Sequence, residues 1–370
     1  MWRKENDIQT MLRDSAGEFL GREHDAQRIR GLRGTLPGYH ADFWMKMVDL
    51  GWAGMLLPED DGGSGLGMAP ALTLANCFGE HLVPEPFISC AIMSATLLDN
   101  ANSDVAASAR AKMASGESLF LPALACQGAV APVLSVDGDA CRVDGSLQMV
   151  PDWSPAAMLL VECQGPEGAA IFLIDGKELT VQAQQMADGT WSARTELEGV
   201  EVAKRQILLE GPQADAAIEL ARARGTVALC ALLDGLTKRL MTMTIEYVTQ
   251  RRQFDRALSD FQALRHGIAD LYIQHELSSA SWRSAAERLE ADGAQAAGMA
   301  IAAAKARSSA AAMLAAKAGV QYHGAFGYTA EADIGLYVNA ILRNAARMGN
   351  ATQQITTIAD IYHEGRYEHA

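Results

Sequence analysis

The stretch A-M-L-L-V-E-C-Q-G-P-E-G-A-A-I-F-L-I-D-G, residues 157–176, decides the fold class of this 370-residue chain. It contains two short apolar runs, 157–163 and 169–174, which have the composition of β-strands. Turn signals surround them: V-D-G-D at 136–139, V-D-G at 143–145, I-D-G at 174–176 and A-D-G at 187–189. Short strands at such close spacing are typical of a compact antiparallel sandwich or barrel. We therefore expect a small central β domain over residues 118–210.

The sequence on both sides of this segment has a helical period. Near the start, one helical face carries apolar residues: Ile8, Met11, Leu12, Ala16, Phe19 and Leu20. A second helix is expected over roughly 41–50. After E-G-P at 210–212 the pattern stays helical to the end, and residues 295–319 are rich in alanine, which suits close helix packing. The expected fold is mostly α in an α+β arrangement, with an N-terminal helical domain (1–117), the β domain and a C-terminal four-helix bundle (211–370).

Composition excludes several classes of function. The net charge of -14 argues against binding to nucleic acid and to anionic membranes. Six scattered cysteines without a C-x-x-C pair predict free thiols in a reducing compartment. The N-terminus has no apolar signal core, and no apolar run is long enough to span a bilayer. These features predict a cytoplasmic protein without a membrane anchor.

Motifs for metal, dinucleotide and hydrolase chemistry are missing from the sequence. The eight histidines form no H-x-x-x-H pair, and His266 and His275 are expected on different parts of one helix. Gly63, Gly65 and Gly67 do not have the G-x-G-x-x-G spacing, and acidic residues precede them. No G-x-S-x-G is present. We expect neither a metal site nor a Rossmann-type loop.

A basic, aromatic segment leads into a predicted helix in R-R-Q-F-D-R-A-L-S-D-F-Q-A-L-R-H-G-I-A-D, residues 251–270. Phe261, Leu264, Ile268 and Leu271 recur there at helical steps of three and four. Two interpretations stay open from the residues alone. Arg251 could pair with a surface acid while Phe254 packs in the core, or the two could hold an anionic ligand.

Three motifs in the same order resemble the acyl-CoA dehydrogenase family over nearly the whole chain. They are W-M-K-M-V-D-L-G-W-A-G-M-L-L-P-E-D-D-G-G-S-G-L-G (44–67), the R-x-x-F helix entry followed by F-Q (251–262), and Q-Y-H-G-A-F-G-Y-T-A-E-A-D (321–333). The resemblance implies FAD bound between subunits without a Rossmann fold, an acyl-CoA substrate and an electron-transfer flavoprotein as electron acceptor. The cofactor-binding positions that it implies are Arg251, Phe254, Gln262, Gln321, Gly324, Gly327 and Thr352.

The position of the catalytic base departs from the family pattern. Family chemistry is α,β-dehydrogenation of an acyl thioester, in which a carboxylate removes the α proton. The two positions that carry this base in the family correspond here to Asn350 and Gly225, and neither residue can accept a proton. The patterns E-A-D-x-x-L-Y (331–337) and R-M-G-N-A (347–351) resemble the branch that degrades steroids and other bulky acids. Several members of that branch are α2β2 assemblies in which one subunit brings the base, so we expect a related partner chain to supply it.

Other departures keep two alternatives open. The family's T-E-P-x-A-G-S-D stretch has no counterpart in residues 118–129, and S-L-Q-M-V-P-D-W (146–153) replaces the usual aromatic strand near the flavin. Ala325 replaces the second glycine of the G-G pair, and Asp255 stands where glycine usually follows the phenylalanine. One alternative is therefore a non-catalytic subunit that has lost FAD. The other is a homomeric enzyme with a relocated base, for which Asp234 and Glu246 are candidates, although an ion-paired or solvated surface role is expected for both.

Overall fold

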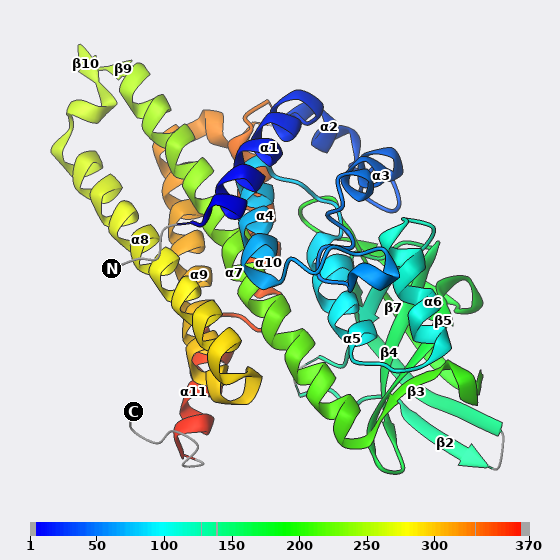
Figure 1. Ribbon diagram of the computed structural model, residues 1–370. Coiled ribbons are helices and arrows are strands. Elements are labelled where there is room, and N and C mark those ends of the chain that lie inside the picture. The colour runs from blue at the N-terminus through cyan, green and yellow to red at the C-terminus, as the bar shows by residue number, and fades with distance from the viewer. Residues whose placement is uncertain (1–4, 127, 138–139, 330, 364–370) are drawn as a thin grey trace. The chain divides into compact units, whose positions relative to one another are not determined.

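The computed structural model describes residues 5–126, 128–137, 140–329 and 331–363. The expected features at residues 1–4 and at Gly138–Asp139 of the V-D-G-D turn lie outside these ranges, as do Gln127 and Ala330 of the family motifs. The chain folds into two compact units, one of residues 31–71 and 84–225 and one of residues 1–30, 72–83 and 226–370 (Figure 1).

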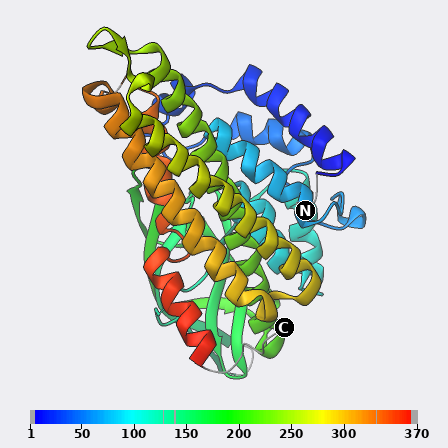
Figure 2. The same cartoon turned by 90° about the vertical axis from the view of Figure 1, so that its left-hand side faces the viewer.

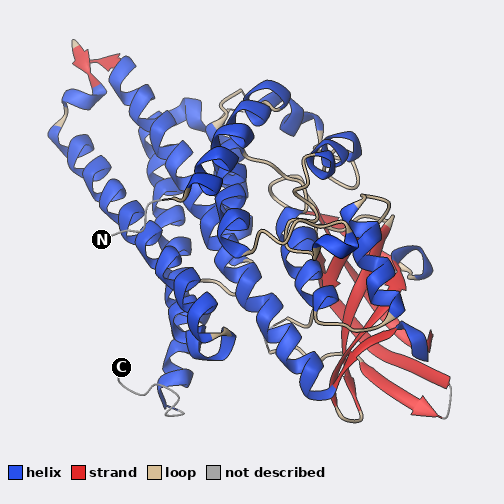
Figure 3. Cartoon of the chain, in the orientation of Figure 1, coloured by secondary structure: helices blue, strands red, loops and turns tan. Residues whose placement is uncertain are grey.

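The unit of residues 31–71 and 84–225 contains the β domain, as Figure 3 shows by its red strands. The strands are β1 Leu119–Ala123, β2 Val133–Asp137, β3 Ala140–Pro151, β4 Ala157–Gly165, β5 Gly168–Asp175, β6 Val181–Gln185, β7 Trp191–Ala203 and β8 Ile207–Glu210. They form one eight-stranded sheet in the order β6-β7-β3-β2-β4-β5-β8, with β1 beside β4. The two apolar runs that predicted strands are β4 and β5, and their residues pair in an antiparallel register.

Two details of the sheet differ from the sequence prediction. The sheet is mixed, because β1 and β2 each pair with β4 in parallel. The V-D-G at 143–145 is no turn: it lies inside β3, where the register against β7 shifts. Gly145 has φ 136° there, and a Cβ on it would lie 2.8 Å from the Cα of Pro132. The glycine thus forms a bulge inside a strand, and in the sequence such a bulge has the same pattern as a turn.

The helices of this unit precede and follow the strands. They are α3 Ala41–Asp49, a π-helix at Ile88–Ser94, α5 Ala95–Asp99, α6 Asp104–Ala114 and the first part of α7 Gly211–Gln250. The predicted helix at 41–50 is confirmed as α3, which buries Phe43 and Met47. The π-helix packs against β1, and all its residues are buried.

The other unit is helical apart from one small hairpin. Its elements are α1 Asp7–Glu23, α2 Ala26–Gly31, α4 Met68–His81, the rest of α7, β9 Arg252–Gln253, β10 Arg256–Ala257, α8 Gln262–Asp292, α9 Ala294–His323, α10 Ile334–Ala346 and α11 Ala351–His363. On α1 only Ala16 and Leu20 of the predicted apolar face are fully buried, and Met11 is exposed.

Helix α9 is the centre of the bundle. It packs against α8, α10 and α11, and α8 and α11 can be followed beside it in Figure 2. Its alanines, among them Ala304 and Ala312, are buried at these contacts, and small side chains let the helix axes approach. The alanine-rich sequence therefore predicted its packing correctly.

Two glycines allow α4 and α7 to cross in contact. A Cβ on Gly79 would lie 2.1 Å from the carbonyl oxygen of Leu232, and one on Gly235 would lie 2.1 Å from that of Asn76. Backbone therefore meets backbone at both points, and no other residue fits at either one.

Candidate functional site

The segment expected to enter a helix through Arg251 is a hairpin at one end of the bundle. Helix α7 ends at Gln250, the N–H of Arg251 donates to the carbonyl of Tyr247 at 2.8 Å, and α8 begins only at Gln262. Phe254 and Asp255 form the turn of the hairpin, with φ of 53° and 62°. The basic, aromatic segment leads into the expected helix, α8, through this hairpin, and Arg251 and Arg252 lie outside both α7 and α8. The left-handed φ of Asp255 explains why glycine is usual at this position in the family.

The arginines of the hairpin differ in their contacts. A guanidinium nitrogen of Arg252 donates to the carbonyl of Asp255 at 3.1 Å, and the guanidinium of Arg256 lies 3.8 Å from the ring centre of Phe261. The exposed side chain of Arg251 makes no hydrogen bond or ion pair within the described part of the chain. Phe254 is 83% exposed, so its expected alternative as a core residue is excluded. Arg251 and Phe254 are thus available to a molecule outside this chain.

Aromatic contacts join the 321–327 segment to the same end of the bundle. The Tyr247 ring stacks on His323 at 4.2 Å, and its hydroxyl donates to the carbonyl of His323 at 3.3 Å. The Tyr247 ring also stacks with Phe326 at 6.2 Å. Burial lowers the pKa of His323, whose Nδ1 lies 2.8 Å from the Gly319 carbonyl, so the ring is neutral at pH 7. Tyr247 therefore packs against this segment and binds its backbone.

Each of the two expected glycines of this segment is needed by the fold itself. Gly324 ends α9 with φ 62°, and its N–H donates to the carbonyl of Val320. The space beside Gly324 is open, whereas a Cβ on Gly327 would lie 2.9 Å from Cδ1 of Ile334. Gly324 therefore serves the chain reversal and Gly327 the packing, and only Gly324 leaves room for close approach by a ligand.

Close packing places the start of α8 beside the end of α9. A Cβ on Gly267 would lie 2.0 Å from the hydroxyl of Tyr322. Six expected cofactor residues lie at this end, where Figures 1 and 2 both show the hairpin and the end of α9 together. These six are Arg251, Phe254, Gln262, Gln321, Gly324 and Gly327.

Thr352 lies elsewhere on the bundle. It is exposed in the first turn of α11, and the turn before α11 contacts Lys305 in the middle of α9. Lys305 and Gln321 are about 24 Å apart along α9, at about 1.5 Å per residue. The structure therefore separates the seven expected cofactor residues into a group of six and Thr352.

Residues that neighbour the two positions of the missing base are in contact. Thr226 follows Gly225 on α7, and its hydroxyl donates to the sulfur of Met348 at 3.5 Å, two residues before Asn350. Asn350 caps α11: its side-chain oxygen accepts from the N–H of Gln353, and its own N–H donates to the Gln353 side chain. Neither 222–232 nor 346–354 contains an aspartate or glutamate. Asn350 thus serves as a helix cap, and both chain segments lack a carboxylate.

Asp234 was expected at the surface, and this expectation was wrong. It is 3% exposed and accepts hydrogen bonds from Asn76, at 3.1 Å, and from the Ser279 hydroxyl. His275 Nε2 lies 3.1 Å from an Asp234 oxygen without a well-aligned hydrogen bond, so the attraction is mainly between charges. Burial would raise the pKa of Asp234 and lower that of His275, but their mutual attraction reverses both shifts. This saturated, ionised carboxylate is a structural ion pair, whereas Glu246 is exposed as expected.

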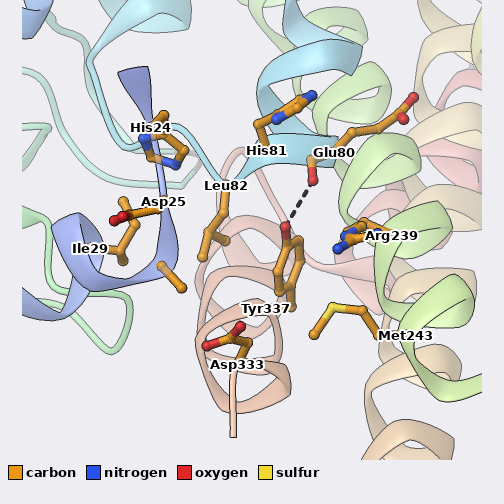
Figure 4. Close-up of a pocket in the computed structure, with 11 residues that line it drawn as sticks. His24, Asp25, Ile29, Glu80, His81, Leu82, Arg239, Met243, Asp333 and Tyr337 are labelled. Atoms are coloured by element: carbon orange, nitrogen blue, oxygen red, sulfur yellow. Dashed lines mark hydrogen bonds between the residues drawn. The ribbon is translucent and has the colours of Figure 1, made fainter. Parts of the chain in front are cut away.

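Two residues of the E-A-D-x-x-L-Y pattern, Asp333 and Tyr337, line a cavity of about 380 Å³ (Figure 4). The hydroxyl of Tyr337 donates to the carbonyl of Glu80 at 2.8 Å, and Asp333 pairs with Arg30 at 2.6 Å. Burial lowers the pKa of His24 in its lining to about 4. The motif residues thus join α10 to α4 and α2, and none of the expected cofactor residues lines this cavity.

In the β domain, the two stretches that depart from the family pattern lie side by side. Residues 123–126, 129–130 and 146–149 line a pocket of only about 10 Å³. The only hydroxyl among these lining residues belongs to Ser146, and it accepts from the Gln148 amide at 2.6 Å. This place offers few free donors to a polar ring.

The described residues contain neither a metal-binding cluster nor a membrane-spanning helix. No three or more His, Cys, Asp or Glu residues in that part of the chain are arranged to hold a metal ion. No helix within those ranges has the length and apolar character that a membrane crossing requires.

Sequence comparison identifies two matching domains. Residues 6–117 match the acyl-CoA dehydrogenase N-terminal domain, and residues 214–362 match the acyl-CoA dehydrogenase C-terminal domain. The chain is 27% identical over 331 residues to acyl-CoA dehydrogenase FadE27 of Mycobacterium tuberculosis, covering 86% of this chain and 87% of FadE27. It is 26% identical over 334 residues to acyl-CoA dehydrogenase IpdE2 of the same organism, covering 88% of each.

Structure comparison finds the same fold in two-component proteins. A variant of the Tcur3481-Tcur3483 steroid ACAD superposes with a TM-score of 0.88 at 25% identity, covering 97% of this chain and 98% of that one. The ChsE4-ChsE5 complex from Mycobacterium tuberculosis superposes with a TM-score of 0.90 at 23% identity, covering 98% and 99%. At that identity the second likeness concerns the fold alone.

Proposed function

Because this chain belongs to the acyl-CoA dehydrogenase family, we propose that it is one subunit of a heteromeric, FAD-dependent acyl-CoA dehydrogenase. A related partner chain supplies the catalytic base. The observation that carries the proposal is the contact between Thr226 and Met348, which neighbour the two base positions, on segments without a carboxylate. General base catalysis needs a proton acceptor within hydrogen-bond reach, and the amide of Asn350 is not one.

The end of the bundle fits the pyrophosphate and adenine side of FAD. When bound, FAD accepts the β hydrogen of the acyl chain as hydride. The guanidinium of Arg251, which has no partner among the described residues, can hold a phosphate through two parallel hydrogen bonds. Phe254 offers an exposed aromatic face, and Gln262 and Gln321 are exposed amides at the same end. In this proposal they contact a cofactor that lies mainly on another subunit.

The β domain of this chain fits the flavin ring poorly. The stretch that contacts the ring in the family is absent, and the hydroxyl of Ser146 is already paired with Gln148. A division of labour follows, in which this chain contributes the phosphate side of the FAD site and the partner the ring side and the base. Thr352, which follows the turn that contacts Lys305 in the middle of α9, belongs in this scheme to a second cofactor contact.

The substrate that we propose is the acyl-CoA thioester of a steroid-derived or other bulky acid, with an electron-transfer flavoprotein as electron acceptor. Two relatives support this choice: the Tcur3481-Tcur3483 protein is titled a steroid ACAD, and FadE27 is named an acyl-CoA dehydrogenase. The cytoplasm is the proposed location, since all six cysteines are free thiols and five are buried.

A second candidate is a subunit of the same fold that has lost FAD. The filled pocket at residues 123–149 favours it, and the free Arg251 opposes it. A homomeric enzyme with Asp234 as base is disfavoured, because that carboxylate is buried and fully paired.

Co-expression tests the proposal. The chain is purified alone and together with a related chain that has glutamate at either base position. Flavin absorbance, light scattering and acyl-CoA oxidation with ferrocenium are then compared. We expect an oligomer that retains FAD and turns over only with the partner. Efficient oxidation by the isolated chain contradicts the proposal, as does a monodisperse monomer at micromolar concentration in the presence of the partner. A stable complex without flavin supports the second candidate.

A further inference from the structure

Lys305, in the middle of α9, is a fully buried lysine with 0% exposure. Its Nζ donates three hydrogen bonds: to the Ser309 hydroxyl at 2.8 Å, to the Ala345 carbonyl at 2.9 Å and to the Gly349 carbonyl at 3.1 Å. An ammonium group has three donors, so every one of them is used. No carboxylate lies within ion-pair distance of Lys305 among the described residues, so carbonyl and hydroxyl oxygens satisfy the charge.

Two of the three acceptors belong to the end of α10 and the turn before α11. In this turn, Met348 and Gly349 have φ of 53° and 86°, and a left-handed methionine is rare. The Gln354 amide donates to the Met348 carbonyl at 2.6 Å, and Asn350 caps α11 directly afterwards. Such a backbone persists only where its surroundings fix it, and Lys305 is the buried part of these surroundings.

We propose that Lys305 is a positioning residue that fixes the 347–350 turn and thereby the direction in which α11 presents Thr352. A lysine is costly to bury, because its charge loses hydration and a hydrophobic residue could fill the same space. The hydrogen bonds of the ammonium offset this cost by stabilising the turn, because they connect the middle of α9 to Ala345 before the turn and to Gly349 within it. The inference rests on the proposed function only for the role of Thr352 in contacting FAD.

The protonation of Lys305 provides a readout that simple packing does not. Burial lowers its pKa to about 8 from the ordinary 10.5. The charged groups facing it are the Cys230 thiol on α7, whose pKa burial raises to about 11, and the Arg347 guanidinium of the turn itself. Cys230 therefore stays protonated over most of the range between pH 8 and 10.5, and Lys305 is the group that titrates there.

The sign of the effect follows from linkage. When the turn opens, Lys305 meets water and regains its higher pKa, so the open state binds more protons between pH 8 and 10.5. The neutral amine keeps two donors for the Ala345 and Gly349 carbonyls and can accept from the Ser309 hydroxyl, so the three contacts persist while the cost of the buried charge disappears. Rising pH therefore favours the closed turn. For these two pKa values, the ratio of closed to open turn rises about fifteenfold from pH 8 to pH 9.5.

Hydrogen–deuterium exchange of the full-length chain tests the proposal. Protection factors of the peptide covering 347–353, corrected for intrinsic exchange, are measured for the wild type, Lys305→Met and the control Lys317→Met, an exposed lysine on the same helix. We expect Lys305→Met to lower protection at pH 7 about tenfold or more and to lose the rise between pH 8 and 9.5. Lys317→Met should keep the wild-type values.

Each outcome decides something. Equal protection in wild type and a folded Lys305→Met protein overturns the proposal. A wild-type protein without the rise in protection also overturns it, and this measurement remains if Lys305→Met does not fold. FAD content of the complex separates the two levels: a loosened turn with normal flavin content leaves Lys305 in its role and argues against Thr352 as a cofactor residue.

Discussion

Two pairs of left-handed residues shape the helical unit, and their surroundings differ. Phe254 and Asp255 form the tip of an exposed hairpin, where Arg251 has no partner within the described residues. Met348 and Gly349 form a turn whose polar groups are bound by Lys305, Gln354 and the helix cap. Both regions were expected to contact FAD. The hairpin therefore leaves a guanidinium available to an external molecule, whereas the polar groups of the 347–350 turn form hydrogen bonds within the chain.

The largest expected effect concerns catalysis at the 347–350 turn. The isolated chain should oxidise acyl-CoA about 10²–10⁴-fold more slowly than its complex, the usual contribution of a general base. Asn350→Glu should recover part of this rate, although loss of the Asn350 cap costs about 1 kcal/mol of stability. Asn350→Asp keeps the cap and serves as the control with a shorter carboxylate. Stopped-flow reduction of the flavin measures the rates, and an isolated chain as fast as its complex contradicts the comparison.

The next effect concerns the exposed hairpin. Arg251→Ala should weaken FAD retention roughly ten- to a hundredfold without destabilising the fold, since a charge-assisted hydrogen bond contributes about 1.5–3 kcal/mol. Arg251→Lys should recover part of the affinity. Arg252→Ala is the control, because Arg252 is bound to the Asp255 carbonyl. The measurement is flavin absorbance after dialysis of the complex. If Arg252→Ala loses flavin and Arg251→Ala does not, Arg252 and not Arg251 binds the cofactor.

A smaller effect separates packing from binding in the 321–327 segment. Gly327→Ala should lower the free energy of unfolding by about 1–3 kcal/mol through overpacking against Ile334. The control is Gly298→Ala, inside α9. The added Cβ would lie 3.7 Å from Cδ1 of Ile361, an ordinary contact, so stability should stay unchanged or rise slightly. Urea unfolding compares them. An unchanged midpoint for Gly327→Ala would show that the side chain of Ile334 can move aside. The need for glycine at this position would then come from ligand binding and not from packing.

The smallest effect is at the hairpin tip. Asp255→Gly removes the left-handed strain of a side chain while adding backbone freedom to the unfolded chain, so it should stabilise the protein by about 0.5 kcal/mol. The urea midpoint measures it. If the substitution destabilises the chain, Asp255 makes a contact that outweighs its strain.

Sequence patterns over a few residues correctly predicted the strands β4 and β5 and the helix α3. The apolar runs of β4 and β5 and the period of α3 were sufficient, because burial follows directly from their spacing. The β9–β10 hairpin was missed, because Q-F-D-R carries none of the usual turn pairs and its left-handed residues are a phenylalanine and an aspartate.

The candidate site was predictable only in part. Arg251 and Gln321 lie at one end of the bundle as the motifs implied, although the hairpin that carries Arg251 was not predicted. The burial of Asp234 depends on Asn76 and His275, which are distant in sequence, so no local pattern reveals it. Lys305 was missed for the opposite reason: a single lysine among alanines has the pattern of an exposed helix position, and only the α10–α11 turn brings its acceptors.

The exposed hairpin also has a consequence for the synthesis of the protein in the cell. Phe254 is 83% exposed and Phe326 is 47% exposed at the same end of the bundle. A chain made without its partner carries this aromatic surface uncovered, and such surfaces promote aggregation and recognition by proteases. In the proposed complex the partner would cover this surface, so a surplus of this chain should be prone to aggregation and degradation.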